Sequence, residues 1–251
     1  MSAPTVYFVT GANRGIGFAF VNSLAQRDDV LIFAGARDPS KADKLNALAK
    51  EKEGKIVVVK LEVTSDDDAQ KAAETVKEKS SKVDVLIANA GIGLGFGPAH
   101  QLDPKDLQTV IDVNVGGPLR IYKALYPLLI ASPSPRVIGV SSTLGSIATN
   151  ADPAQIGPYQ GGSYSISKTA LNMLFARIHT ENHKEHNMTA FVVCPGHAQT
   201  DMGSAGAQAF GMEEAPVKVE DSIKGLLGFI DDETKQYAGR FMSYDGAERP
   251  W

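Results

Sequence analysis

A tyrosine and a lysine, Tyr164 and Lys168, stand four residues apart in the segment 163–168. On a helix, side chains at this spacing leave the same face one turn apart. A phenol titrates near ~10 and is a poor proton donor at neutral pH, but a neighbouring ammonium stabilises the phenolate and lowers that pKa. We therefore expect Tyr164 to exchange a proton with a carbonyl oxygen, with Lys168 lowering its pKa. The alternative is a helix with one solvated lysine, because Tyr-x-x-x-Lys is common by chance.

Composition limits the classes of partner. The chain has 251 residues, of which 43% are hydrophobic and 22% charged, with a net charge of −4. This acidic balance argues against nucleic acid or a membrane surface as the main partner. The single cysteine, Cys194, excludes an internal disulfide and fits a reducing compartment. Without a leader-like start or an apolar run of ~18–20 residues, a cytoplasmic location is expected.

Apolar runs alternate with helical patterns along the whole chain. A run buried on both faces is typical of a parallel strand. The expected strands are 6–10, 30–34, 56–61, 83–88, 137–141, 189–193 and 239–242. Helices are expected from Asp103 to the prolines near 133, from Tyr164 to about 184, and over 219–230. The pattern predicts one α/β domain over residues 1–251, a Rossmann-like doubly wound parallel sheet with helices on both faces. Ligands of such sheets bind beyond the carboxyl ends of the strands.

A glycine-rich turn lies between the first expected strand and its helix. Glycines there allow a tight turn and close backbone approach, and the helix N-terminus presents N–H groups to a pyrophosphate. The spacing is Gly-x-x-x-Gly-x-Gly, and a plain glycine turn is the alternative. The cofactor-binding candidates in this turn are Gly11, Asn13, Arg14, Gly15, Ile16 and Gly17.

The end of the second strand indicates which dinucleotide is bound. An acid at this place hydrogen-bonds the adenosine ribose, whereas an arginine accommodates a 2′-phosphate. Arg37 stands there and Arg14 could converge on the same phosphate, while Asp38 favours the unphosphorylated cofactor. Two arginines outweigh one acid, so the prediction is NADP(H), unless Arg37 is only a surface charge.

Further motifs occur in a characteristic order. They are Thr10-Gly11-x-x-x-Gly15-x-Gly17, Asn89-Ala90-Gly91, Asn114, Ser142, Tyr164-x-x-x-Lys168 and Pro195-Gly196. In this set the chain resembles the short-chain dehydrogenase/reductase family from Val6 to about Met202. The stretch 35–39 and the ending 245–251 are also similar to one subgroup. It holds fungal aromatic-polyketide ketoreductases of the norsolorinic acid ketoreductase type and C-factor-like and sniffer-like carbonyl reductases.

The resemblance implies four catalytic residues. Tyr164 would be the proton donor, and Lys168 would hold the nicotinamide ribose. Ser142 would hydrogen-bond the substrate carbonyl, while its neighbour Ser141 would face the other way. Asn114 would hold a water that links the lysine to solvent, although a satisfied structural amide is the alternative.

The resemblance also implies the rest of the cofactor site. Residues 89–91, that is Asn89, Ala90 and Gly91, would close over the adenine side. Pro195, Gly196 and Thr200 would cover the nicotinamide and its phosphates, although Thr200 could equally cap a helix. Relatives usually have an aspartate where Glu62 stands, so the backbone of Val63 is a second candidate for the adenine contact.

The substrate side is expected to be apolar. The gap between Ser142 and Tyr164 is longer than usual, and we predict a loop over the substrate mouth at 147–162 and a lid-like segment at about 197–216. The substrate-contact candidates are Leu94, Phe96, Ser142, Leu144, Ile147, His197, Met202 and Phe210. An apolar mouth favours a bulky or aromatic carbonyl compound.

These observations predict an NADPH-dependent carbonyl reductase. No metal is required, because Ser142 and Tyr164 supply the electrophilic hydrogen bonds. Two alternatives remain: a catalytically retired NADP(H)-binding sensor or scaffold protein, and an NAD-dependent alcohol dehydrogenase that works oxidatively. Relatives often pair through the helices after Asp103 and Tyr164, so a homodimer or homotetramer is possible.

Overall fold

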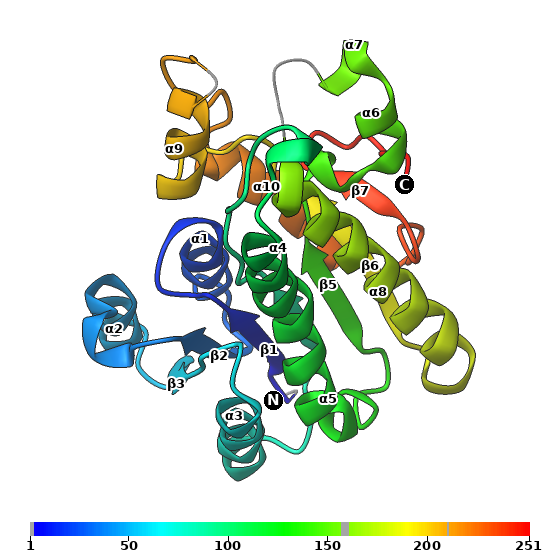
Figure 1. The fold of residues 1–251 in the computed structure, drawn as a ribbon. Helices are drawn as coiled ribbons and strands as arrows, with labels where there is room; N and C mark the ends of the chain where they lie inside the picture. The colour runs from blue at the N-terminus through cyan, green and yellow to red at the C-terminus, as the bar shows by residue number, and fades with distance from the viewer. Residues whose placement is uncertain (1–2, 157–160, 210) are drawn as a thin grey trace.

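Seven parallel strands form one continuous sheet in the computed structural model, which describes residues 3–156, 161–209 and 211–251 (Figure 1). Their order is β3-β2-β1-β4-β5-β6-β7. The strands are β1 (Thr5–Thr10), β2 (Val30–Ala36), β3 (Ile56–Lys60), β4 (Val85–Ala88), β5 (Arg136–Val140), β6 (Thr189–Cys194) and β7 (Phe241–Ser243). This confirms the predicted doubly wound sheet. The chain leaves β1 toward β2 on one side, and β4 lies on the other, so the strand order reverses between β1 and β4. Ligands of open α/β sheets bind at such a switch point.

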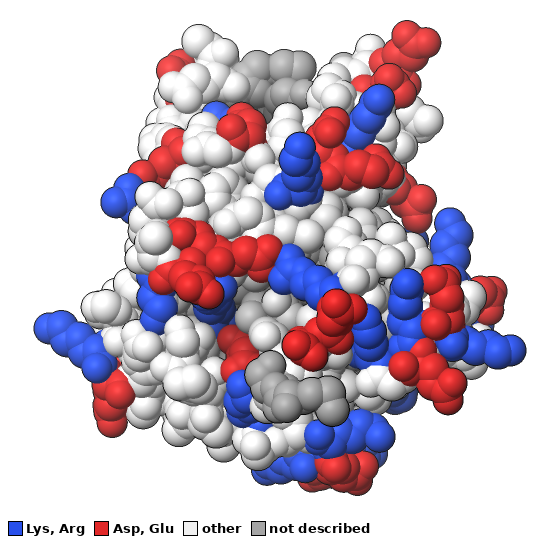
Figure 2. Space-filling model, turned by 180° about the vertical axis from the view of Figure 1, so that it is seen from behind, with Lys and Arg blue, Asp and Glu red and all other residues white. Residues whose placement is uncertain are grey.

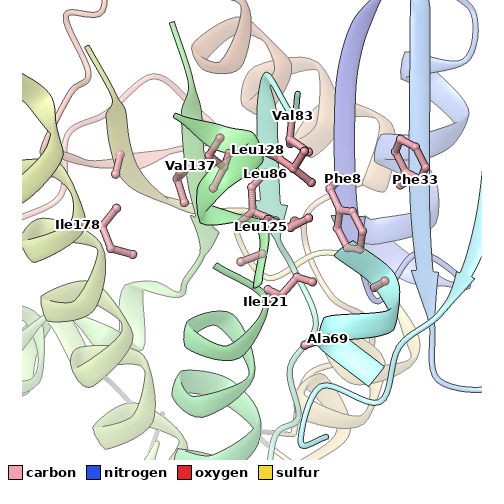
Figure 3. Close-up of a cluster of buried hydrophobic side chains, with 14 of the residues drawn as sticks. Phe8, Phe33, Ala69, Val83, Leu86, Ile121, Leu125, Leu128, Val137 and Ile178 are labelled. Atoms are coloured by element: carbon pink, nitrogen blue, oxygen red, sulfur yellow. The ribbon is translucent and has the colours of Figure 1, made fainter. Parts of the chain in front are cut away.

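Helices cover both faces of the sheet, as predicted. One face packs against α3 (Asp66–Lys79), α5 (Gly117–Leu129) and α8 (Gly162–His186). The other packs against α1 (Gly15–Leu24), α2 (Asp43–Glu51) and α10 (Val219–Asp231). Figure 3 shows the first of these cores, where Phe8 and Phe33 of the sheet meet Ala69 of α3 and Ile121 of α5. Strands that are buried on both faces account for the continuous apolar runs in the sequence.

The helix expected from Asp103 is divided by a π-helical turn. Asp103 caps α4 (Pro104–Ile111) by accepting a hydrogen bond from the Lys105 backbone N–H at 2.8 Å. The π-turn η3 (Asp112–Gly116) follows and leads directly into α5. π-turns within α-helices are frequent at functional sites, and this one contains Asn114.

The segment predicted as a loop at 147–162 is mostly helical where the structure describes it, so that prediction was wrong. It forms α6 (Ile147–Ala151) and α7 (Pro153–Ile156), while 157–160 lie outside the described residues. Ser146 caps α6 by accepting from the Thr149 N–H at 3.0 Å, and Asp152 accepts from the Ala154 N–H at 2.9 Å. These caps satisfy backbone donors that a loop would leave to solvent.

Charges of both signs are interspersed on the face seen from behind (Figure 2). Ion pairs occur within the described part of the chain, such as Arg27 with Asp231 at 2.6 Å. No helix within the described ranges is long and apolar enough to cross a membrane.

Candidate active site

The glycine-rich turn after β1 is closed by backbone contacts that only glycine permits. Gly11 has φ +64° and Gly15 has φ +55°, in the left-handed region that favours glycine. A Cβ on Gly17 would lie 2.2 Å from the Gly11 carbonyl oxygen. Arg14 occupies the N-cap position of α1 without a capping side-chain bond, so the first N–H groups of α1 are not used by that side chain. The turn therefore presents bare backbone and a helix N-terminus, as a dinucleotide pyrophosphate requires.

The end of β4 is bound to this turn. The Thr10 hydroxyl accepts hydrogen bonds from the backbone N–H groups of Asn89 and Ala90, at 3.0 and 2.9 Å. The Asn89 side-chain amide donates to the Thr10 carbonyl at 2.9 Å and to the Gly11 carbonyl at 3.3 Å. Asn89 and Ala90 thus hold the switch point between β1 and β4 in shape. The side chain of Asn89 is engaged with the turn itself.

Helix α8 carries Tyr164 and Lys168 on one face, as the sequence predicts. Lys168 is 4% exposed, and its Nζ donates to the Val140 carbonyl at the end of β5 at 2.8 Å. The same Nζ lies 5.7 Å from the centre of the Tyr164 ring. A Cβ on Gly91 would lie 3.5 Å from it, so Lys168 reaches the segment that follows β4. The two side chains therefore meet at the carboxyl ends of the central strands.

The pKa of Tyr164 departs from the expectation. Burial raises the pKa of Tyr164, Cys194 adds to the rise, and a hydrogen bond with Ser142 opposes it. Burial also lowers the pKa of Lys168 to about 8. The expected net lowering of the Tyr164 pKa was therefore wrong for this structure, because burial outweighs the contacts that oppose the rise. Tyr164 is consequently a protonated phenol throughout the neutral range.

The two adjacent serines after β5 point in different directions. Ser142 hydrogen-bonds Tyr164 and accepts from the Leu144 N–H at 3.2 Å, which starts the 3₁₀ turn η4 (Thr143–Gly145). Ser141 is buried and donates to Asn172 Oδ1 on α8 at 2.6 Å. The expectation that Ser141 faces away is thereby confirmed, and Ser142 is the serine at the site.

Asn114 is fully buried and its amide is satisfied by protein groups. Its Oδ1 accepts from the Ile92 N–H at 2.8 Å, and its Nδ2 donates to the Ile92 carbonyl and to Ser167 Oγ, both at 2.9 Å. Ser167 Oγ in turn donates to the Tyr164 carbonyl at 2.7 Å. These contacts agree with the alternative in which Asn114 is a structural amide satisfied by protein groups. They place Asn114 between the segment after β4 and the first turn of α8.

The expected phosphate-binding arginines are exposed and each faces an acid. Arg14 lies 3.2 Å from Asp201 at the start of α9 (Asp201–Ala209), and Arg37 lies 3.9 Å from Glu62. The rival acid Asp38 is engaged locally, since its carboxylate accepts from the Ser40 N–H and hydroxyl at 3.1 and 2.6 Å. These bonds to Ser40, with Lys41, lower the pKa of Asp38.

The remaining cofactor candidates lie around the same edge of the sheet. Val63 is nearly buried, and a Cβ on Gly117 would lie 2.9 Å from its side chain. Gly196 has φ +73°, and a Cβ on it would lie 2.6 Å from the Tyr244 ring. Thr200 accepts from the Gly203 N–H at 3.1 Å, which confirms the helix-cap alternative. Its methyl group also lies beside Gly15, within 3.4 Å of a built Cβ.

Some of the apolar residues predicted to contact substrate lie near Tyr164. The Phe96 ring lies 5.7 Å from the Tyr164 ring, tilted by 34°, and is 47% exposed. A Cβ on Gly93 would lie 3.1 Å from Phe96 and 3.8 Å from Met202, so α9 approaches the same place. Leu94 and Ile147 are exposed, whereas Leu144 is half-buried. His197 Nε2 lies 2.7 Å from the Gly203 carbonyl, inside the segment that carries α9. Phe210 lies outside the described residues.

Three residues that join the site were missed from the sequence. Cys194 Sγ lies 3.3 Å from the Thr143 N–H nitrogen and 3.4 Å from that of Gly196, and thus links η4 to the Pro195–Gly196 turn. Asn172 donates to the Gly145 carbonyl at 3.1 Å, and Ser167 contacts Asn114. Polar residues within the apolar stripe of α8 were the signal for Ser167 and Asn172.

The doubly wound sheet and the glycine-rich turn at its switch point define a protein of the nucleotide-binding α/β class. The family model described as short chain dehydrogenase matches residues 5–209, and the chain belongs to this family. It is 34% identical to norsolorinic acid ketoreductase of Aspergillus parasiticus, over 98% of this chain and 91% of that protein.

Solved structures support the same assignment. The NADPH-bound carbonyl reductase from chicken fatty liver matches with a TM-score of 0.87 and 33% identity, over 100% of both chains. The carbonyl reductase Sniffer of Drosophila melanogaster matches with a TM-score of 0.85 and 25% identity, also over 100% of both chains. The resemblance to this family is therefore confirmed.

Proposed function

We propose that this protein uses NADPH to reduce the carbonyl group of a bulky, aromatic or polyketide-like ketone or aldehyde. The observation that carries the proposal is that the buried Lys168 ammonium lies 5.7 Å from the centre of the Tyr164 ring and donates to the Val140 carbonyl, just before Ser142 in the chain. Two hydroxyls beside each other can both hydrogen-bond one carbonyl oxygen and stabilise the charge that develops on it.

Reduction requires a hydride at the carbonyl carbon and a proton at its oxygen. NADPH, when bound, would supply the hydride. As the carbon accepts the hydride, the π electron pair moves to the oxygen, and the Tyr164 hydroxyl donates its proton there to give the alcohol. Ser142 donates a hydrogen bond to the same oxygen. The resulting Tyr164 phenolate faces the Lys168 ammonium, which stabilises it until a proton returns from solvent.

The residues present fit a nicotinamide dinucleotide. The cradle from Gly11 to Gly17 would bind the pyrophosphate, and Lys168 near Gly91 would bind the nicotinamide ribose. Arg14 at the start of α1 and Arg37 after β2 would bind the 2′-phosphate, because both are exposed while Asp38 is held by Ser40. The similar chicken reductase binds NADPH, which supports this choice.

The substrate class follows from the apolar groups beside Tyr164. Phe96 and Met202 expose hydrophobic surface there, which favours an aromatic or otherwise bulky compound. We assign the segment 197–216, which carries α9, the role of a lid, because Asp201 and Thr200 contact the glycine-rich turn. The similar ketoreductase of Aspergillus parasiticus is named for a reaction on norsolorinic acid.

Loss of reduced-nicotinamide absorbance with a panel of carbonyl compounds tests this proposal. Wild type should turn over polycyclic aryl ketones faster than small hydroxy-ketones, and Tyr164→Phe should lower kcat by about 10²–10⁴-fold with little change in NADPH affinity. NADPH binding without any turnover would support the sensor alternative. Tighter binding of NADH than of NADPH, with turnover of alcohols, would support the oxidative dehydrogenase.

A further inference from the structure

The end of the described chain contacts the helix that follows the catalytic serine. Residues 245–249 turn back along β7, where the Arg249 N–H donates to the Phe241 carbonyl at 2.7 Å and Met242 pairs antiparallel with Glu248. This return brings Trp251 to α6, and the Ala148 N–H donates to the Trp251 backbone oxygen at 3.1 Å. Figure 1 shows the red end of the chain beside α6.

The Trp251 ring is anchored on the sheet. It stacks on Phe241 of β7 with ring centres 5.8 Å apart and planes 29° apart. Phe241 is fully buried in the core, whereas Trp251 is 43% exposed. The tryptophan ring thus covers Phe241 of β7. This stacking holds the Trp251 backbone oxygen in place to accept the hydrogen bond from the Ala148 N–H.

Helix α6 is in turn bound to the turn that carries the catalytic serine. The Asn150 side chain donates to the Leu144 carbonyl at 2.8 Å and to the Ser146 carbonyl at 2.7 Å. The Ser146 N–H donates to the Thr143 carbonyl at 3.0 Å. Displacement of α6 would therefore move the backbone beside Ser142. A helix of five residues is too short to be stable alone, so its position depends on such contacts.

We propose that Trp251 is a positioning residue for substrate specificity, which holds α6 against the sheet edge and so determines how a bulky carbonyl compound is received beside Ser142. The inference rests on the proposed reduction of bulky carbonyl compounds. Trp251 acts through α6 on binding of the large part of the substrate. Small carbonyl compounds, which need only Ser142 and Tyr164, do not depend on it.

The first arm of the test needs no turnover. Amide hydrogen exchange is measured over residues 146–152 in the NADP⁺ complexes of wild type, Trp251→Ala and Trp251→Phe. Without the ring, the Trp251 backbone oxygen should no longer be held beside the Ala148 N–H. Exchange of that N–H should then be about five- to tenfold faster, the effect of one hydrogen bond. Trp251→Phe keeps a ring on Phe241 and should restore protection. Unchanged exchange in Trp251→Ala would overturn the proposal, whether or not the protein reduces any ketone.

The second arm separates specificity from general damage. Trp251→Ala should raise KM for a polycyclic aryl ketone by about five- to tenfold at nearly constant kcat, and leave a small aldehyde unaffected. Ile130→Ala, which removes a comparably exposed side chain at the end of α5, should change neither. An equal loss for both substrates would show a merely structural role and overturn the proposal.

A spectroscopic reading complements both arms. Trp251 is the only tryptophan of the chain, so its fluorescence reports on this place alone. Addition of the aryl ketone to the NADP⁺ complex should change the emission of wild type, while the small aldehyde should not. No change with a ketone that binds would overturn the proposed link. If wild type reduces no carbonyl compound at all, the proposed function fails, while exchange still decides whether Trp251 holds α6.

Discussion

Replacement of the buried lysine by methionine should change how stability depends on pH. Burial lowers the pKa of Lys168 from 10.5 to about 8, and the cause is the unfavourable transfer of its charge from water. Below the lower value, the folded protein carries a buried charge that opposes folding. Between the two values the unfolded chain binds more protons, so stability rises with pH over this interval. Above both values the penalty is gone.

The size of the effect follows from linkage. The two pKa values imply a cost of about 3 kcal/mol at a pH of about 7 and about 1 kcal/mol at a pH of about 10. Lys168→Met removes the titrating group. The other effects of the substitution on the free energy of unfolding, from changed packing and from the lost bond to Val140, are the same at both pH values. The stability difference between wild type and Lys168→Met should therefore shift by roughly 2–3 kcal/mol in favour of wild type on going to high pH.

Parallel thermal unfolding of the cofactor-free proteins measures this shift. For a chain of this length it corresponds to about 5–10 °C in the difference between the two Tm values. Lys71→Met is the matched control, because Lys71 is exposed and the hydrogen bond to Asp67 raises its pKa. The Tm difference between wild type and Lys71→Met should not shift in favour of wild type as the pH is raised. A constant gap between wild type and Lys168→Met would refute the reasoning. Lys168→Met should also lose reductase activity, so function and stability are opposed at this residue.

Three further changes test other parts of the site. Arg37→Ala should weaken NADPH binding about tenfold and leave NADH binding unchanged, by fluorescence titration of the reduced cofactors; equal losses would mean that it does not bind the 2′-phosphate. Gly17→Ala should abolish cofactor binding and lower Tm, because its Cβ would overlap the Gly11 carbonyl; a wild-type Tm would contradict this. Asn172→Leu leaves the buried Ser141 hydroxyl without its acceptor and should cost about 1–3 kcal/mol in urea unfolding, with kcat reduced more than NADPH affinity. A fall in affinity alone would argue against a role in placing the serine turn.

Elements with strong local signals were predictable from the sequence. Continuous apolar runs placed every strand to within a few residues, because parallel strands are buried on both faces. A helix was expected from Tyr164 to about 184, and α8 runs over Gly162–His186. The two helices after Ser146 were missed, although Asp152-Pro153 repeats the start signal recognised at Asp103-Pro104. The unusual length of the gap between Ser142 and Tyr164 had favoured a loop instead.

Properties that depend on burial and distant partners were not predictable. The pairing of Arg14 with Asp201 joins residues far apart in the chain, and no local pattern announces it. Whether the pKa of Tyr164 is raised or lowered depends on how deeply the first turns of α8 are buried. The spacing predicted Lys168 as the neighbour of Tyr164, but it did not predict which atoms the ammonium would contact.

The π-turn at Asp112–Gly116 limits how the helix around Asn114 can be altered. One surplus residue in a turn rotates everything beyond it by about 100° relative to a regular α-helix. Val110 before the turn and Ile121 after it are both buried, so their common orientation depends on that surplus residue. Deletion of a single residue there would restore a regular ladder of hydrogen bonds but swing one half of the helix toward solvent. Length variation should therefore be tolerated far less at this turn than in the surface loops.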